Sequence, residues 1–194
     1  MTSESNMIID FIVEIPANSY VKYEFDKDKN MLRVDRILHT SMAYPGNYGY
    51  IPDTLARDGD PIDVLMIPDY KIYPMSLVKA KIIGVLKMKD EKGYDEKLIV
   101  VPDDSIDPYY SEFNDIKDVP KHLLGKIRHF FEHYKDTEPK KWVLVEEFGD
   151  RYEAEKLYLE SCQNFNKKTL PLLRKFSHPV PRLESIAEDI CGND

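Results

Sequence analysis

The chain has 194 residues and carries 35 acidic side chains against 27 lysines and arginines, which gives a formal net charge of −8. This length suits one domain with a single core, and the acidic balance disfavours nucleic-acid binding, which requires lysine and arginine to neutralise phosphates. Two distant cysteines, no secretory signal and no apolar run near the ~20 residues of a membrane helix favour a cytoplasmic protein without disulfides or a membrane partner.

Alternating apolar residues predict strands at the start of the chain. Residues 8–15 favour a strand, and a proline turn follows. Residues 20–25 alternate, with Lys22 and Glu24 on one face, and this pair alone is typical of a solvated, salt-bridging surface. A charged turn at residues 26–30 predicts a hairpin with a strand over residues 31–38, which contains Arg36.

Residues 43–52 have neither helical nor strand periodicity. Two prolines, two glycines and three tyrosines predict a rigid, irregular loop. The tyrosines of such a loop either pack beneath it or bind a ligand.

Three carboxylates then fall within six residues. Asp58, Asp60 and Asp63 lie on a turn bent by a glycine and a proline, at the mouth of a short buried strand over residues 64–67. Converging carboxylates repel one another unless a hard cation lies between them, and their oxygens suit Mg²⁺, Mn²⁺ or Ca²⁺. A solvated acidic turn is the alternative, whereas the spacing of an EF-hand calcium loop is absent.

A second acidic turn follows a long strand over residues 76–88, which we expect to kink at Gly84. The turn carries Asp90, Glu91 and Asp95, with Lys97 directly behind, and another strand covers residues 98–101. Alone, this segment is typical of an ordinary charged β-turn. Beside the first acidic turn, it is a candidate second wall of a metal site.

Helical periodicity appears late in the chain. After an acidic loop over residues 103–118, Asp118 can cap a helix that has Pro120 in its first turn and ends near Lys135. A short strand over residues 142–147 and a second helix, which we expect to stop at Pro171, come next. We expect residues 177–194 to be an appended tail with one short helical turn near residues 183–190.

One motif on the first helix competes with this interpretation. The sequence from His129 to His133 matches the H-x-x-E-H pattern of inverted zinc peptidases, with both histidines one helical turn apart. The chain is short for such an enzyme, and no downstream acidic helix supplies a third ligand. Together with His122, the motif favours a titratable helix face at a subunit contact.

Taken in order, these residues resemble the soluble family I inorganic pyrophosphatases in their short, bacterial-type form. The likeness covers about residues 8–165 and rests on the specific Asp-Gly-Asp-Pro-x-Asp signature at residues 58–63. Further matching segments are residues 14–18, 22–24, 34–36, 44–50, 90–97 and 129–136. The resemblance implies a mainly β (α+β) fold, an OB-type closed five-stranded β-barrel flanked by two main α-helices. It implies one pyrophosphatase domain over residues 1–176 and leaves residues 177–194 as a C-terminal tail of unknown role.

The resemblance also implies an activity, the Mg²⁺-dependent hydrolysis of inorganic pyrophosphate to two orthophosphates by in-line attack of water. Several Mg²⁺ ions would bind per site, with Mn²⁺ or another divalent ion as a substitute. The implied metal ligands are Asp58, Asp63, Asp95, Asp90, Glu14 and Glu24. The implied catalytic residues are Asp60 as general base, Tyr48 and Arg36. The implied substrate-binding residues are Lys22, Arg36, Tyr48, Lys97, Tyr134 and Lys135, with Tyr44 beside them.

Alternatives from two other classes remain at this point. One is a non-catalytic OB-type binding module, which the absence of a basic and aromatic stripe disfavours. The other is a different metal-dependent phosphohydrolase or nucleotidyl-transfer enzyme, which the absence of a glycine-rich phosphate loop disfavours. Because short members of the family form hexamers, we expect a homo-oligomer, with a hexamer favoured and with His129 and His133 at the interface.

Overall fold

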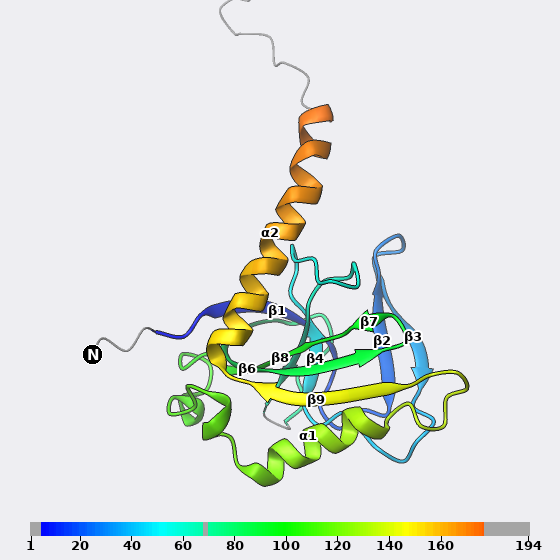
Figure 1. The fold of residues 1–194 in the computed structure, drawn as a ribbon, viewed down its shortest axis with the longest axis vertical. Helices are drawn as coiled ribbons and strands as arrows, with labels where there is room; N and C mark the ends of the chain where they lie inside the picture. The colour runs from blue at the N-terminus through cyan, green and yellow to red at the C-terminus, as the bar shows by residue number, and fades with distance from the viewer. Residues whose placement is uncertain (1–4, 68–69, 177–194) are drawn as a thin grey trace, which may run out of the picture.

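The computed structural model describes residues 5–67 and 70–176, and the centre of the protein is a ring of five β-strands (Figure 1). The ring runs in the order β1 (Ile8–Ile15), β4 (Asn47–Tyr50), β5 (Asp63–Met66), β8 (Lys97–Pro102) and β6 (Leu77–Asp90), and β6 pairs back with β1. All these pairs are antiparallel except β5 with β8, which is parallel. The expected closed, five-stranded architecture is confirmed.

Further strands lie beside the ring. β7 (Gly93–Tyr94) and β9 (Val143–Gly149) pair with β6, while β2 (Val21–Asp26) and β3 (Met31–Ile37) form the expected separate hairpin. Two 3-10 turns, Pro108–Tyr110 and Ile116–Asp118, lie in the acidic loop after β8.

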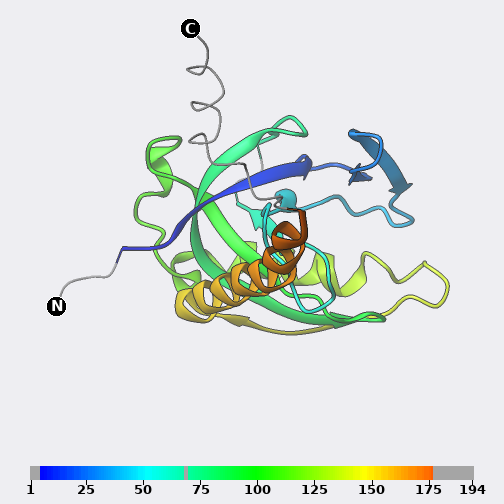
Figure 2. The same cartoon turned by 90° about the horizontal axis from the view of Figure 1, so that it is seen from above.

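The two helices cover different parts of the ring. α1 (Lys121–His133) contacts β9 and contributes Phe130 and Phe131 to one buried cluster. α2 (Arg151–Phe176) packs on β6 through Ala154 and then projects away from the ring (Figures 1 and 2). No helix in the described part of the chain combines the length and apolar character that crossing a lipid bilayer demands.

The irregular loop predicted over residues 43–52 is wrong in part, because Asn47–Tyr50 form strand β4. This strand lies between β1 and β5 and is almost wholly buried, so it shows no alternation of polar and apolar residues. A Cβ atom on Gly49 would lie 1.8 Å from the carbonyl oxygen of Ile12. Glycine therefore permits the close approach of β4 to β1, and it also hides the strand from sequence patterns.

Two predictions about helix ends are also wrong. Asp118 does not cap α1, because its carboxylate accepts hydrogen bonds from the backbone of Asn114 and Asp115 at 3.0 and 2.9 Å and so closes the preceding 3-10 turn. The N-cap of α1 is Pro120, with no side-chain hydrogen bond. α2 continues through Pro171 to Phe176. Proline leaves the carbonyl four residues earlier without its helical donor, and on a projecting segment water can hydrate that carbonyl. The tail and its expected helical turn lie outside the described residues.

Candidate active site

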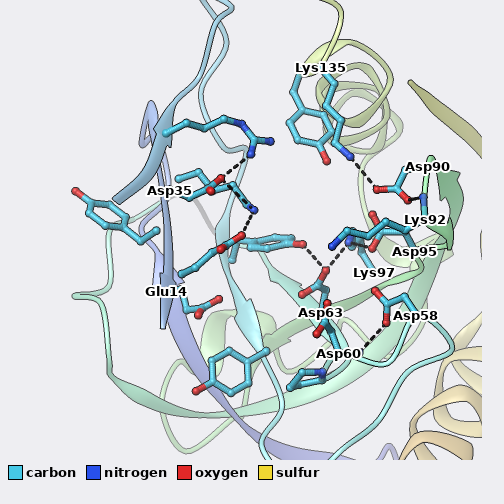
Figure 3. A pocket seen from close by; sticks show the side chains of 18 of the residues that line it. Glu14, Asp35, Asp58, Asp60, Asp63, Asp90, Lys92, Asp95, Lys97 and Lys135 are labelled. Carbon is cyan, nitrogen blue, oxygen red and sulfur yellow. Dashed lines mark hydrogen bonds and ion pairs between the residues drawn. The ribbon is translucent and has the colours of Figure 1, made fainter. Parts of the chain in front are cut away.

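A cavity of about 530 Å³ opens at one end of the ring (Figure 3). Its walls come from β1, the β2–β3 hairpin, β4, both acidic turns and the segment that follows α1. The side chains that the sequence assigns to the site all line this cavity: Glu14, Lys22, Glu24, Arg36, Tyr44, Tyr48, Asp58, Asp60, Asp63, Asp90, Asp95, Lys97, Tyr134 and Lys135. The fold therefore brings together residues from many separate segments of the chain.

Strand pairing joins the two acidic turns. The parallel register of β5 with β8 sets Asp63 opposite Lys97, although the two residues are 34 positions apart. Asp95 lies two residues before Lys97, and its carboxylate also contacts the ammonium of Lys97. In β4, the hydroxyl of Tyr48 donates a hydrogen bond to Asp63 at 2.6 Å.

The ammonium of Lys97 lies between the carboxylates of Asp63 and Asp95 and contacts both. Only 2% of this lysine is exposed. Burial by itself would lower the pKa of Lys97, but the charges of Asp63 and Asp95 outweigh burial and raise it well above its ordinary value. A permanently charged cation therefore holds these two carboxylates together.

The turn that carries Asp58 and Asp60 is fixed from within. Gly59 has a φ of 93°, a conformation that side chains with a Cβ rarely adopt. The backbone N–H of Asp60 donates to the carboxylate of Asp58 at 3.1 Å. The buried hydroxyl of Thr54 accepts from the N–H of Ile62 at 3.0 Å and so closes the loop. In the described part of the chain, the carboxylate of Asp60 has no hydrogen bond or ion pair and remains available to a ligand.

Asp58 lies near several other negative charges. Burial raises its pKa, the hydrogen bond from the backbone of Asp60 lowers it, and the charges of Asp60, Asp63 and Asp95 raise it further. The net shift is upward. A cation bound among these carboxylates would relieve this repulsion.

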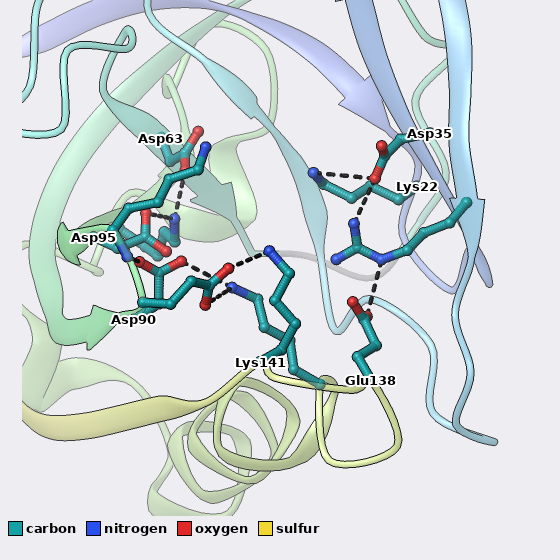
Figure 4. A network of polar contacts seen from close by, with 12 residues as sticks. Lys22, Asp35, Asp63, Asp90, Asp95, Glu138 and Lys141 are labelled. Atoms are coloured by element: carbon teal, nitrogen blue, oxygen red, sulfur yellow. Dashed lines mark hydrogen bonds and ion pairs between the residues drawn. The ribbon is translucent and has the colours of Figure 1, made fainter.

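Lys135 binds the second acidic turn. Its ammonium donates to Asp90 at 2.8 Å and lies 3.5 Å from Glu91, which also contacts Lys141 (Figure 4). Burial tends to raise the pKa of Asp90, but the hydrogen bond from Lys135 and that from the backbone of Lys92 lower it overall. Asp90 is therefore held ionised.

A third cluster joins the hairpin to the segment after α1. Nη1 of Arg36 donates to Asp35 at 2.5 Å, and Lys22 lies 3.5 Å from the same carboxylate (Figure 4). Nε of Arg36 donates to Glu138 at 2.9 Å, and Lys22 also contacts Glu24. Register explains part of this cluster, because Lys22 is paired with Arg36 across the hairpin.

Glu14 is the carboxylate most affected by burial. Desolvation raises its pKa to about 7, against the lowering effect of a hydrogen bond from the N–H of Phe25 at 2.7 Å. The nearby charges of Asp63 and Glu24 raise this pKa further. Glu14 can therefore hold a proton near neutral pH until a cation arrives.

Three phenols complete the lining. Burial raises the pKa of Tyr44, Tyr48 and Tyr134 above the ordinary value, and neighbouring carboxylates add to this shift. Each phenol therefore keeps its proton and can donate a hydrogen bond to an anionic oxygen.

The donor set fits a hard divalent cation in chemistry. Among the described residues, nine carboxylates and seven cationic side chains line the cavity, so it is net negative when all are ionised. Carboxylate oxygens are the donors that Mg²⁺ prefers. As the side chains stand, however, no three Asp, Glu, His or Cys side chains in the described part of the chain converge as a cage, because lysines already pair with several carboxylates.

Four residues hold the cavity together although the sequence assigned none of them an individual role: Asp35, Glu91, Glu138 and Lys141. Asp35 precedes Arg36 on a strand, and that position could have signalled its role. Glu138 is 102 positions from its partner Arg36, and no local pattern indicates the contact.

The zinc-peptidase motif does not form a metal site. The rings of His129 and His133 lie 4.7 Å apart, and Nδ1 of His133 is 2.8 Å from Asp136. Neither histidine lines the large cavity, and the described residues offer no third ligand.

Comparison with known sequences gives consistent matches. A sequence model of a family described as inorganic pyrophosphatase matches residues 11–166. An inorganic pyrophosphatase of Saccharolobus solfataricus is 49% identical over 146 residues, which cover 75% of this chain and 85% of that protein. One from Helicobacter pylori strain 26695 is 51% identical over 146 residues, covering 75% and 84%.

Solved structures agree with the sequence matches. An inorganic pyrophosphatase structure from Helicobacter pylori has a TM-score of 0.81 at 44% identity and covers 86% of this chain and 99% of that one. The structure of an inorganic pyrophosphatase from Thermus thermophilus has a TM-score of 0.79 at 38% identity and covers 86% and 94%.

Proposed function

The chain belongs to the inorganic pyrophosphatase family, and we propose from this premise that it hydrolyses inorganic pyrophosphate to two orthophosphates with Mg²⁺ as its metal. The observation that carries the proposal is the convergence, in one cavity, of many carboxylates with lysine, arginine and tyrosine donors. Pyrophosphate is a small polyanion without an apolar part, so its recognition must be electrostatic. A net negative cavity can accept it only when cations are bound among the carboxylates.

The acidic side chains would divide between metal binding and proton transfer. Asp58, Asp63 and Asp95 would hold Mg²⁺, and Asp90, Glu14 and Glu24 would hold further ions. When bound, the metal supplies Lewis-acid charge that activates water and neutralises phosphoryl oxygens. Asp60, whose carboxylate has no partner in the described part of the chain, would accept the proton of the attacking water.

The basic side chains and phenols would bind the two phosphoryl groups. Arg36 keeps guanidinium donors beyond those given to Asp35 and Glu138, and a planar guanidinium can bind phosphate through two hydrogen bonds. Lys22, Lys97 and Lys135 would exchange their carboxylate partners for phosphoryl oxygens once those carboxylates hold metal. Tyr134 would donate from a phenol whose raised pKa keeps it protonated, and Tyr48, likewise protonated, would exchange its hydrogen bond to Asp63 for one to a phosphoryl oxygen. These contacts would orient the substrate for in-line attack and neutralise charge on the leaving phosphate.

Phosphate release from pyrophosphate by the purified protein tests this proposal. We expect rapid hydrolysis in Mg²⁺, loss of hydrolysis in excess chelator, and slow hydrolysis of nucleoside triphosphates, because the cavity is lined mainly by charged side chains. A folded protein that releases no phosphate in Mg²⁺ or Mn²⁺ would contradict the proposal. Faster hydrolysis of a nucleoside triphosphate than of pyrophosphate would indicate that the protein is a different metal-dependent phosphohydrolase.

We further infer a cytoplasmic homo-oligomer, with a hexamer favoured. A groove of about 490 Å³ beside α1 is lined by His122, His129 and Phe130 together with Met42 and Pro45, which supports a subunit contact on this face. Sedimentation equilibrium tests the assembly. A monomer at micromolar concentration would contradict it.

A further inference from the structure

Behind the first acidic turn lies Arg57, a residue outside the active cavity. It precedes Asp58 in the chain but lines a different groove, of about 270 Å³, between the ring and α2. Its side chain is 51% exposed, so its position depends on a few specific contacts. Those contacts lead to the second acidic turn and to α2.

The first contact is with the second acidic turn. Nη1 of Arg57 lies 3.4 Å from the carboxylate of Glu96, which stands between Asp95 and Lys97 in the sequence. The side chain of Glu96 is only 11% exposed, and Arg57 is its one hydrogen-bonding or ion-pair partner in the described part of the chain. A largely buried carboxylate with a single partner depends strongly on that partner.

A second contact strengthens this connection. The Arg57 guanidinium lies over the ring of Tyr94, 5.1 Å from its centroid, and Tyr94 belongs to β7 in the same turn. A cation above an aromatic ring is attracted by about 0.5–1 kcal/mol at an exposed site. One guanidinium thus binds residues on both sides of Asp95.

The third contact is with α2. Nη2 of Arg57 lies 3.8 Å from Glu160, and two residues earlier the N–H of Leu55 donates to the carbonyl of Ser161 at 3.0 Å. Ser161 is almost fully buried. A backbone hydrogen bond therefore fixes the loop that carries Asp58 to α2, and Arg57 links this loop to the second acidic turn.

We propose that Arg57 is a positioning residue of the metal site, which fixes Asp58 relative to Asp95 by joining their two turns through Glu96 and Tyr94. This inference rests on the proposed function, since it takes Asp58 and Asp95 to share a cation. Arg57 touches neither carboxylate in the described contacts and acts through backbone segments. Residues that orient metal ligands commonly change metal affinity about 10–100-fold when they are replaced.

The direction in which Mg²⁺ affinity changes distinguishes a positioning role from a simple electrostatic effect. Arg57 is a cation close to a cation site, so removing its charge would by itself strengthen Mg²⁺ binding. Loss of positioning would weaken it. A weaker site after removal of a positive charge therefore has to come from the lost connection.

To test this, metal-stripped, full-length protein is titrated with Mg²⁺ alone. Binding is measured by calorimetry and, independently, by the rise in Tm. For Arg57→Gln we expect the Kd for Mg²⁺ to rise about three- to tenfold, below the usual range because Arg57 is half exposed. Arg57→Lys keeps the charge and should stay within about threefold of the native Kd. The kcat at saturating Mg²⁺ should change less than about twofold, because Arg57 does not line the active cavity.

Lys87→Gln provides the matched control. Lys87 lines the same groove and pairs with Glu153 of α2 at 3.0 Å and with Glu147 of β9 at 3.3 Å, but it contacts neither acidic turn. The Lys87→Gln variant loses the same positive charge as Arg57→Gln, so its Kd for Mg²⁺ should stay level or fall. Glu96→Gln should weaken Mg²⁺ binding, and adding Arg57→Gln to it should produce less than the additive loss, since both variants remove the contact between Arg57 and Glu96.

Each result decides between defined possibilities. An unchanged or tighter Mg²⁺ site in Arg57→Gln overturns the positioning role, and so does a fully additive loss in the double variant. If the native protein binds no Mg²⁺, the proposed function fails and this inference fails with it. If the native protein binds Mg²⁺ and Arg57→Gln binds it equally well, the inference alone fails.

Discussion

Glu138 accepts a hydrogen bond from Nε of Arg36 at 2.9 Å and joins the β2–β3 hairpin to the segment after α1. Asp35 accepts from Nη1 of the same guanidinium at 2.5 Å. Nη2 has no partner in the described part of the chain. The two carboxylates therefore fix the plane of the guanidinium and leave donors for a phosphoryl group (Figure 4).

Replacing Glu138 by glutamine should misorient Arg36. We expect kcat/KM for pyrophosphate to fall about tenfold, because a charge-assisted hydrogen bond contributes about 1.5–3 kcal/mol and only part of it is lost in the amide. Steady-state kinetics at saturating Mg²⁺ measure this. Glu132→Gln is the control, since Glu132 pairs with Arg128 at 3.3 Å outside the cavity. Equal kcat/KM in both variants would show that Glu138 does not orient Arg36 for catalysis.

Lys97→Met should make the metal-free protein less stable and more responsive to Mg²⁺. The buried ammonium lies between Asp63 and Asp95, so its loss leaves two neighbouring carboxylates without their shared cation and lowers the free energy of unfolding by about 3 kcal/mol. Mg²⁺ should restore much of this loss. The measurement is the Tm in chelator and in Mg²⁺, and a Mg²⁺-dependent rise no larger than in the native protein would argue against a shared site.

Asp60→Asn should separate catalysis from metal binding. The carboxylate has no partner in the described residues, so we expect kcat to fall about 10²–10⁴-fold as proton transfer is lost. The Kd for Mg²⁺, measured by calorimetry, should change less than about threefold. Parallel loss of both quantities would reassign Asp60 as a metal ligand.

The pKa of Glu14 predicts a pH dependence of stability. Burial raises this pKa from 4.5 to about 7, so the folded protein keeps a proton that the unfolded chain loses between these values. The free energy of unfolding should therefore fall as pH rises from 4.5 to 7, by at most roughly 3 kcal/mol, and stay low above pH 7.

Urea denaturation at pH 5 and pH 8 in chelator measures this dependence. Glu14→Gln cannot ionise and should lose the fall that Glu14 causes. Glu112→Gln, at an exposed position, should retain it. If the native protein and Glu14→Gln show the same pH dependence, burial of Glu14 is not its cause.

Much of the fold was predictable because periodicity reflects one-sided burial. β1, the β2–β3 hairpin, β6 and α1 each bury one face more than the other or follow clear turn residues. β4 was missed because both its faces are buried and Gly49 lies against β1. The continuation of α2 past Pro171 was missed because a proline was expected to end the helix.

Asp58, Asp60, Asp63, Asp90 and Asp95 were predictable because they form two dense clusters next to strands, whereas only the family resemblance indicated Glu14 and Glu24. The residues that orient the site were not predictable. Glu138 acts on Arg36, and Arg57 on Glu96, across long stretches of chain, and each pair looks like ordinary surface charge in the sequence. Only the folded arrangement shows which charges are neighbours.

The closed ring has a consequence for how the protein folds. β1 pairs with β6 through Ile8 and Lys81, and β5 pairs with β8 through Asp63 and Lys97, so both contacts join distant parts of the chain. The last wall of the cavity, at Lys135 and Lys141, comes later still. A refolding chain therefore gains its substrate pocket only after its slowest, most non-local contacts have formed. Catalytic competence should appear in a single late phase, and refolding intermediates should be inactive.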